Sequence, residues 1–416
     1  MNDAGDDLDR MLAPDEARGI VLANVRPLEP EVVPIDVAGE RYLVDGLIAD
    51  VSLPPFPAAT MDGFAVIHND PAPSRTILGA GFAGDSPSVT VTPGAAAPIM
   101  TGAPVPAGAD AVVPVENTAR GDGFVEIRQA RVSSGENIRP IGADLRQGDL
   151  LVPAGTRLGP AEIGLLASLG HAQVRVGRVP RVAVISTGNE LVAPDARPGP
   201  GQIRDSNRFS LAVAARRAGA EVVVNRHILD DDGALREGIA AAVELADVVV
   251  TSGGVSMGDR DLVKALLGDM ATVHFRRLFM KPGKPLNFAT AGETLLFGLP
   301  GNPVSCLVGF HMFVRPALQV MQHAPPDPNP AVPVTIAHDI APGDRIEYQR
   351  AVVYAGADGR LRARNTGNQI SARLMSFVGS NAYLIVPPAT EIYRSGAQLS
   401  AILLGPPAPA PDDRNR

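Results

Sequence analysis

The stretch RVAVISTGNEL at residues 181–191 indicates which class of domain forms the centre of this 416-residue chain. Residues 181–186 are apolar and β-branched, as in a buried strand, and Ser, Thr and Gly follow as in a tight turn. The alternation continues with a helix over 206–219, a strand over 221–228, a helix over 231–246 and a strand over 247–252. Strands and helices that alternate at this spacing predict a doubly wound parallel sheet. Ligands of such sheets bind beyond the carboxyl ends of the strands.

The same pattern extends to about residue 325, and a different one begins after it. After the pair Gly253-Gly254 we expect a helix near 260–267, strands near 273–279 and 294–297, and a helix that starts at Asn302. The proline-rich residues 323–333 are typical of a linker. Short strands and turns then return over 334–404 and predict a small β-barrel, and the tail from 405 to 416 is expected to be disordered.

The N-terminal half has no βαβ pattern. A helix is expected where Asp15 and Glu16 precede Ala17, Ile20 and Val21 on one face. Short alternating runs from Val32 to about Ile138, broken by Gly and Pro, predict small β units, with Asp62-Gly63 as a hairpin turn. A second helix is expected within 157–170, because Pro160 suits its first turn and Gly170 its end.

Composition excludes several classes of protein. A net charge of -8 and a pI near 5.4 argue against a nucleic-acid partner or an anionic membrane. The single cysteine, Cys306, excludes an internal disulfide and a cysteine metal site, and the seven histidines are scattered. The acidic N-terminus does not resemble a signal peptide, and prolines interrupt the uncharged stretch 86–109. We therefore expect a cytoplasmic protein without a membrane partner, in which any anion site is built locally.

Glycine-rich and acidic residues follow two of the predicted strands. Ser186–Leu191 offers hydroxyls, amides and the carboxylate of Glu190. The segment TSGGVSMGDRD, residues 251–261, leads into a helix, so its amides could bind phosphate and Asp261 could hold a divalent cation. Many α/β turns contain Gly pairs without binding phosphate, so both interpretations stand.

Two rigid loops carry cations and amides. In MKPGKPLNF, residues 280–288, Lys281 and Lys284 each precede proline, which favours a stiff loop that presents both charges to an oxyanion. The alternative is a pair of solvated surface lysines. In FGLPGNPVSC, residues 297–306, Asn302 suits a helix cap, and Ser305 and free amides would face an anion. The alternative there is a turn that only caps the helix.

Seven segments occur in one order along the chain. They are TMDGFAV, MTGAPVPAGADAVVPVE, STGNEL, GQIRDSN, TSGGVSMGDRD, MKPGKP and GLPGNPVS. Together they make the chain, over about residues 10–404, resemble the MoeA/gephyrin E-domain family of molybdopterin molybdenumtransferases.

The resemblance implies a multidomain α/β plus β fold. The N-terminal region spans 10–177 and has two parts: 10–50 with 140–177, and an inserted β domain over about 51–139. A MogA-like α/β domain spans 178–325 and a small β-barrel spans 332–404.

The resemblance also implies the reaction. Adenylylated molybdopterin binds at the α/β domain with molybdate and Mg²⁺, and molybdate replaces the adenylyl group to give molybdenum cofactor and AMP. Family members are homodimers, with each active site between the α/β domain of one subunit and the barrel of the other.

Matching residue by residue assigns roles to this chain. The catalytic group is Asp62, Asp144, Glu190, Asp230, Asp261, Lys281 and Lys284, of which Asp230, Asp261 and Glu190 would hold the metal. The ligand-binding group is Thr187, Gly188, Ser206, Ser252, Gly253, Gly254, Ser256, Pro300, Pro303, Ser305, Arg350, Ser371 and Ser376. Asp62 and Asp144 would either reach the cleft or only order turns.

The chain departs from the family pattern at three places. It has Ala59-Thr60 where Asn-Ser often precedes MDG, Phe64 where Tyr often follows DG, and Ala143 where an acid is common. Three alternatives accompany the transferase: a gephyrin-like scaffold, a related adenylyltransferase with a single α/β domain, and a paralogue that prefers tungstate.

Overall fold

The structure is a computed structural model of the chain, and it describes residues 8, 10–79, 89–254, 270–325 and 330–409. Two compact units divide the chain. The large unit comprises Met1–Val44, Gly155–Gly159 and Gln173–Arg416. The small unit comprises Asp45–Ala154 and Pro160–Ala172.

A seven-stranded sheet forms the centre of the large unit, in the order β1-β19-β21-β22-β18-β14-β17. Its strands are β1 (Met11–Leu12), β14 (Arg181–Thr187), β17 (Glu221–Ile228), β18 (Val248–Ser252), β19 (Thr272–Leu278), β21 (Pro285–Ala291) and β22 (Thr294–Leu299). Neighbours among β17, β14, β18 and β22 are parallel, as the sequence predicted. We call the edge where these four strands end the carboxyl edge.

One strand of the sheet differs from the prediction. Residues 285–291 form β21, although 280–288 was interpreted as a loop, and β21 is antiparallel to both of its neighbours. Ala291 pairs with Thr294, so only two residues connect β21 to β22. A two-residue connection can join antiparallel strands only, since a parallel pair needs a crossover of a dozen residues or more.

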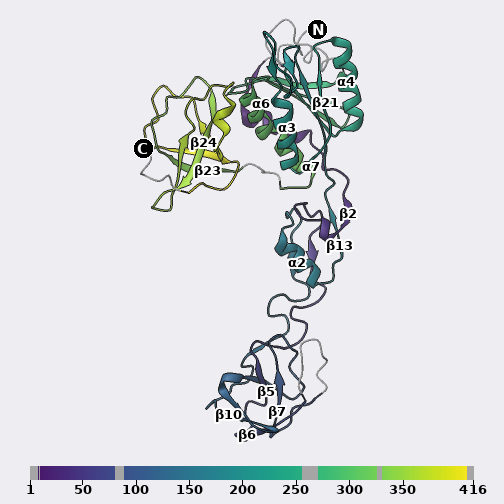
Figure 1. Ribbon diagram of the computed structural model, residues 1–416, viewed down its shortest axis with the longest axis vertical. Helices are drawn as coiled ribbons and strands as arrows, with labels where there is room; N and C mark the ends of the chain where they lie inside the picture. Colours follow the sequence, from purple (N-terminus) through teal and green to yellow (C-terminus); the bar gives the residue numbers. More distant parts are fainter. Residues whose placement is uncertain (1–7, 9, 80–88, 255–269, 326–329, 410–416) are drawn as a thin grey trace. The chain divides into compact units, whose positions relative to one another are not determined.

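Helices cover both faces of the sheet (Figure 1). They are α1 (Pro14–Ala23), α3 (Asn207–Arg217), α4 (Asp232–Leu245), α6 (Pro303–Gly309), the π-helical turn η3 (Phe310–Val314) and α7 (Arg315–Met321). Val182 and Val184 of β14 pack in the cluster that contains α3, α6 and α7, whereas Ala183 and Ile185 pack with α4. Burial of both strand faces explains why β14 is a continuous apolar run.

One of the helices is capped by a side chain, and the cap expected at Asn302 is absent. Asp231 caps α4, because its carboxylate accepts a hydrogen bond from the amide of Ala234 at 2.9 Å. Ser206 and Asn302 stand before α3 and α6, but neither side chain makes a cap hydrogen bond. The helix expected near 260–267 lies outside the described residues.

The continuous helical stretch Pro303–Met321 is long and apolar enough to cross a membrane, and 72% of it is buried within the structure. That burial is typical of a core helix of a globular domain.

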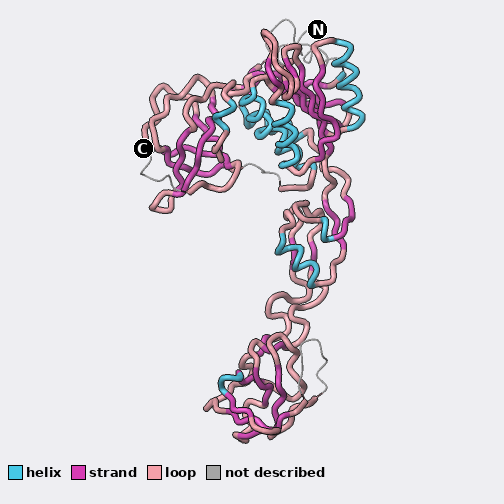
Figure 2. Tube along the Cα trace, in the orientation of Figure 1, coloured by secondary structure: helices cyan, strands magenta, loops and turns pink. Residues whose placement is uncertain are grey.

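The C-terminal region forms a closed barrel, as predicted. Its strands are β23 (Ala331–Ile336), β24 (Ile346–Ala355), β25 (Leu361–Asn365), β26 (Ala382–Val386) and β27 (Gln398–Leu403). The pairing of β24 with both β25 and β26 closes the sheet, and a helical turn, η4 (Leu374–Phe377), is its helical element in Figure 2. A short strand from the α/β region, β20 (Met280–Lys281), pairs in parallel with the start of β24.

The first residues after the barrel are ordered, unlike the disordered tail expected from 405 onward. The amide of Ala408 donates to the carbonyl of Val353 at 2.8 Å, and the Asn381 amide group donates to the carbonyl of Pro406 at 2.8 Å. These bonds extend the barrel edge to residue 408. Residues 410–416 lie outside the described chain.

The small unit is mostly strand and loop, in agreement with the short runs in its sequence (Figure 2). Its six-stranded sheet has the order β8-β5-β7-β6-β10-β9. The strands are β5 (Gly63–Val66), β6 (Ser74–Ile77), β7 (Ala95–Ile99), β8 (Ala111–Pro114), β9 (Thr118–Arg120) and β10 (Phe124–Ile127), with short pairs β4 (Ala58–Ala59) with β11 (Ile138–Arg139) and β3 (Leu47–Ile48) with β12 (Leu150–Val152). The expected helix is α2 (Pro160–Ser168).

The hairpin predicted at Asp62-Gly63 is wrong. The strand before it, β4, pairs with β11, and β5 pairs with β7 and β8. Only glycine fits at the first position of β5, because a Cβ on Gly63 would lie 2.0 Å from the carbonyl oxygen of Val113. The apolar residues on either side of this turn belong to different sheets, which local alternation could not reveal.

Candidate functional site

Three strands of the large unit bring their ends together at the carboxyl edge. The amide of Gly253, after β18, donates to the carbonyl of Leu299, at the end of β22, at 3.1 Å. Gly253 has a φ of +97°, and a Cβ on it would lie 2.5 Å from the carbonyl oxygen of Thr187 at the end of β14. Only glycine fits this contact. The predicted ligand-binding residues Thr187, Gly188, Ser252, Gly253 and Gly254 therefore lie side by side.

Asn207 connects these loops, and the sequence analysis missed it. Its Nδ2 donates to the Oγ of Ser252 and to the carbonyl oxygen of Gly301, both at 2.7 Å. Because a carbonyl can only accept, Nδ2 must face Gly301, which fixes the orientation of the amide. Its Oδ1 is buried and has no hydrogen-bond partner among the described residues. The signal for Asn207 was its position as the last residue of GQIRDSN.

Asp205 is a second missed residue at this edge. The hydroxyl of Ser186 donates to its Oδ2 at 2.6 Å, and the Nε of Arg208 donates to the same oxygen at 3.0 Å. Asp205 is buried, and the predicted residue Ser206 follows it at the start of α3. The carboxylate therefore ties the start of α3 to the end of β14.

Two acids meet beyond β14 and β17. Burial raises the pKa of Asp230, and the negative charge of Glu190 raises it further. The backbone of Asp230 donates to the Oδ1 of Asn189 at 3.1 Å. A Cβ on Gly188 would lie 2.6 Å from the Glu190 carboxylate, so the missing side chain at Gly188 leaves room for that carboxylate. The structure thus brings together two of the three predicted metal ligands, and Asp261, like Ser256, lies outside the described residues.

This pair of acids fits a magnesium ion. Neither carboxylate takes part in an ion pair among the described residues, and burial and the charge of Glu190 raise the pKa of Asp230 against the opposing influence of His227. In the described ranges no group of three or more His, Cys, Asp or Glu could hold a metal. Mg²⁺ commonly takes one or two carboxylates and completes its octahedron with water and substrate phosphates. Two oxygen donors at this edge are sufficient for that mode.

Lys281 lies in β20 and is held by the barrel. Its Nζ lies 2.9 Å from the Oε1 of Glu347, a buried acid on β24. The Lys281 side chain is 50% exposed, so one side of the ammonium faces solvent. Lys281 is therefore more than a solvated surface lysine. Lys284 is half-buried, and its carbonyl accepts a hydrogen bond from the amide of Leu278 at 2.9 Å.

The start of α6 differs from the expectation of free amides. The amide of Val304 donates to the carbonyl of Ser371 at 3.1 Å, so this amide is occupied and not free for an anion. The bond places Ser371, a predicted barrel residue, at the start of α6. Ser305 and Pro300 are buried nearby in the chain, and Pro303 is half-buried at the first position of the helix.

Arg350 and Ser376 meet inside the barrel. The Nε of Arg350 donates to the Oγ of Ser376 at 3.0 Å, and each residue is 1% exposed. Burial lowers the pKa of Arg350 to about 10. Its Nη2 is buried without a hydrogen-bond partner among the described residues. A buried guanidinium with a spare donor is a feature of oxyanion recognition.

The two N-terminal acids belong to the small unit and order turns there. Asp62 Oδ1 accepts hydrogen bonds from the amide and hydroxyl of Thr101, both at 2.7 Å, and these bonds lower its pKa. Asp144 forms an ion pair with Arg139. Both are exposed to solvent, so each could also receive a ligand.

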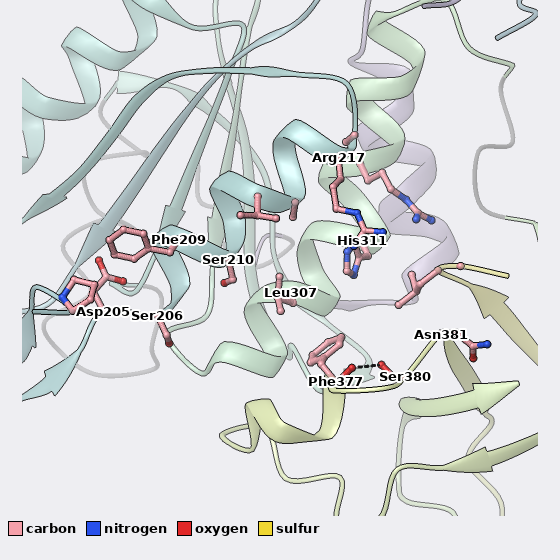
Figure 3. A pocket seen from close by; sticks show the side chains of 17 residues that line it. Asp205, Ser206, Phe209, Ser210, Arg217, Leu307, His311, Phe377, Ser380 and Asn381 are labelled. Carbon is pink, nitrogen blue, oxygen red and sulfur yellow. Dashed lines mark hydrogen bonds between the residues drawn. The ribbon is translucent and has the colours of Figure 1, made fainter. Parts of the chain in front are cut away.

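A cavity of about 1040 Å³ lies beside α3 (Figure 3). Phe209 and Arg217 of α3, His311 of the long helix and Phe377 of the barrel line it. Of the predicted site residues, Ser206 lines this cavity. Most predicted site residues lie elsewhere, so the cavity is a neighbouring groove and not the site itself.

Comparisons with known proteins agree with this architecture. Three family models match in order: MoeA N-terminal region (domain I and II) at 12–170, a probable molybdopterin binding domain at 183–320, and MoeA C-terminal region (domain IV) at 335–404. A molybdopterin molybdenumtransferase of Haemophilus influenzae is 34% identical over 385 residues, which cover 90% of this chain and 94% of that protein.

Gephyrin of Dictyostelium discoideum is 32% identical over 94% of this chain, which spans 62% of that longer protein. The crystal structure of a molybdopterin biosynthesis MoeA protein from Pyrococcus horikosii is similar with a TM-score of 0.80 and 29% identity, covering 95% of this chain and all of that one. Identity of this extent over the whole length shows that the chain belongs to the MoeA family of molybdopterin molybdenumtransferases.

Proposed function

We propose that this chain inserts molybdenum from molybdate into adenylylated molybdopterin and releases AMP. The observation that carries the proposal is the Haemophilus influenzae relative, which bears the name of this activity and matches nearly its full length. The geometry supports it, since glycine loops and two carboxylates lie at the carboxyl edge of the sheet and Lys281 lies where the α/β region pairs with the barrel.

Adenylylated molybdopterin would bind at the carboxyl edge. The loops after β14 and β18 carry small residues, so a ligand can approach their backbone amides closely. The contacts we assign to it are Thr187, Gly188, Ser252, Gly253 and Gly254, with Ser206 at the start of α3 and Ser256, which lies outside the described residues. Asn207 and Asp205 would hold these loops in position.

Lys281 and Lys284 would bind the molybdate dianion with the hydroxyls of Ser305, Ser371 and Ser376. Pro300 and Pro303 would stiffen the loop that carries Ser305. Arg350 would offer its spare buried donor to the same oxyanion. Cleavage of the phosphoanhydride develops negative charge on the departing AMP, and fixed cations lower the free energy of that charge.

A magnesium ion would be held by Asp230 and Glu190, with Asp261 as a third ligand. When bound, the ion would neutralise charge on the phosphates and orient them. We also propose catalytic contacts for Asp62 and Asp144, whose carboxylates are exposed to solvent and are held by Thr101 and by Arg139, respectively.

A homodimer in the cytoplasm completes the proposal. Phe209 and Val213 are exposed apolar residues on α3, 41% and 54% exposed, beside the cavity in Figure 3. A second subunit would cover such a surface. Light scattering on purified protein is expected to give twice the mass of the chain, and an active monomer would contradict it.

The decisive experiment measures AMP. Purified protein is mixed with adenylylated molybdopterin and Mg²⁺, with and without molybdate, and AMP is quantified by chromatography. We expect release that depends on molybdate and stops with a chelator. Lys281→Ala and Lys284→Ala are expected to raise the molybdate concentration needed for half-maximal rate. AMP release that does not depend on molybdate would contradict the transferase assignment. Equal rates of AMP release with tungstate and with molybdate would show that the site does not discriminate the two oxyanions.

A gephyrin-like scaffold is the second candidate. The gephyrin relative extends beyond the match, and this chain spans 62% of it. A fold that is intact by circular dichroism, binds adenylylated molybdopterin and never turns it over would favour the scaffold.

A further inference from the structure

A buried carboxylate stands behind the proposed oxyanion site. Glu347 is 5% exposed, and its Oε1 accepts from the Nζ of Lys281 at 2.9 Å. Its Oε2 accepts from the Nε2 of Gln349 at 2.9 Å. A Cβ on Gly343 would lie 2.5 Å from Oε1, so the chain leaves room for this acid. Both carboxylate oxygens are thus held in defined hydrogen bonds.

The position of this acid is set by backbone pairing between two domains of the large unit. β20 pairs with β24 in a register that places Lys281 beside Glu347. Gln349 and Arg350 follow on the same strand, and the charge of Glu347 favours the protonated form of Arg350. Glu347 therefore contacts one cation assigned to the oxyanion, Lys281, and its charge acts at longer range on a second, Arg350, on the opposite face of β24.

We propose that Glu347 is a positioning residue that holds Lys281 in its place and opposes the binding of the oxyanion, so that molybdate is bound weakly enough to be transferred. This inference rests on the proposed function, because it assigns molybdate to Lys281. The Lys281 ammonium has three donors and an exposed side, so it can keep Glu347 and still contact an oxyanion.

Charge decides the direction of the effect. A dianion that shares the ammonium with Glu347 lies roughly 6 Å from the carboxylate, and in a water-like dielectric this repulsion weakens binding about tenfold. Holding a flexible lysine in one rotamer favours binding by less than this, because its rotamer entropy is only partly lost at a half-exposed site. Removal of the charge is therefore expected to tighten binding and to slow turnover.

The test uses Glu347→Gln, which keeps the shape and removes the charge. Molybdate alone is titrated into the full-length protein by calorimetry, and AMP release is measured separately. We expect a dissociation constant about tenfold lower than in the wild type, together with a lower maximal rate. Unchanged or weaker molybdate binding overturns the proposal. Loss of folding alone cannot produce tighter binding.

Two variants control for charge and for folding. Glu391→Gln removes a carboxylate from an exposed position of the same barrel and should leave molybdate binding unchanged, within about twofold. Glu347→Asp keeps the charge but shortens the side chain, so it should retain the wild-type dissociation constant and slow AMP release. If Asp tightens binding as Gln does, charge is not the cause. An Asp variant with the wild-type rate overturns the positioning role, even where the Gln variant fails to fold.

The calorimetric titration with molybdate separates this inference from the proposed function. A wild type that binds molybdate but releases no AMP would defeat the transferase assignment, while Glu347→Gln would still report on the carboxylate. A molybdate-dependent enzyme whose binding is insensitive to Glu347→Gln would keep the assignment and defeat this inference.

Discussion

Replacement of Asn207 should lower the free energy of unfolding by an amount that can be estimated from its hydrogen bonds at the carboxyl edge. Asn207→Ala removes two hydrogen bonds of 2.7 Å, to Ser252 and to the carbonyl of Gly301. Each is worth about 1 kcal/mol, so the free energy of unfolding should fall by about 2 kcal/mol. Asn207→Asp is expected to cost more, about 3–5 kcal/mol, because it places a buried carboxylate against the carbonyl that accepted the amide.

The two variants should differ in pH dependence. Burial and the Gly301 carbonyl raise the folded pKa of the new carboxyl above its unfolded value. Such a group favours folding most when it is protonated, and stability is lost as pH rises through the folded pKa. Asn207→Asp should therefore recover stability relative to the wild type as pH falls through the folded pKa of the new carboxyl toward its unfolded value of about 4, because the protonated acid can donate to Gly301. Asn207→Ala should show no such recovery.

Urea unfolding followed by far-ultraviolet circular dichroism measures the effect, since the chain has no tryptophan. With a slope of about 3 kcal/mol per molar urea, Asn207→Ala should lower the midpoint by about 0.7 M. Asn225→Asp, the same change at an exposed position of β17, is the matched control and should stay close to the wild type. Equal free energies of unfolding for Asn207→Asp and the wild type at neutral pH would contradict the role assigned to Asn207 in connecting these loops.

Three further outcomes are expected. Because the pKa of Asp230 is raised, protons compete with Mg²⁺ for its carboxylate at a higher pH than at an ordinary aspartate; Mg²⁺ affinity should fall as pH falls through that pKa, and Asp230→Asn should lose this dependence in a calorimetric titration. Gly253→Ala should lower the melting temperature, because its Cβ would meet Thr187, whereas Gly164→Ala, with open space around it, should not. The lowered pKa of Asp62 stabilises the folded small unit above its unfolded pKa and less as pH falls, and Asp62→Asn should flatten that acid-side loss in a melting series.

Sequence pattern predicted the part of the site that depends on strand ends. Parallel strands end at one edge, so Thr187, Ser252 and their glycines had to meet once the strands were recognised. Glu190 followed for the same reason, whereas Asp230 came from the family resemblance; the structure places the two acids within reach of each other's charge. Local spacing was sufficient for these residues because the sheet topology converts position along a strand into position in space.

Contacts across the chain could not be predicted in this way. Asn207 reads as an ordinary first residue of a helix, yet it bonds residues 45 and 94 positions away. The amides at the start of α6 looked free, and Ser371 of the barrel occupies that of Val304. Such partners depend on how separate elements pack, and no periodicity in the sequence records that packing.

The alternation of strands and helices, the barrel, the carboxyl edge and the glycine pair after β18 follow from the sequence alone. The direction of β21, through a two-residue turn, and the partner of Lys281 depend on how distant segments pack. Lys281 and Glu347 are 66 residues apart and meet because β20 leaves the α/β region to pair with β24. Hydrophobic pattern specifies which residues are buried, whereas a buried charge acquires its partner only when two domains pack together.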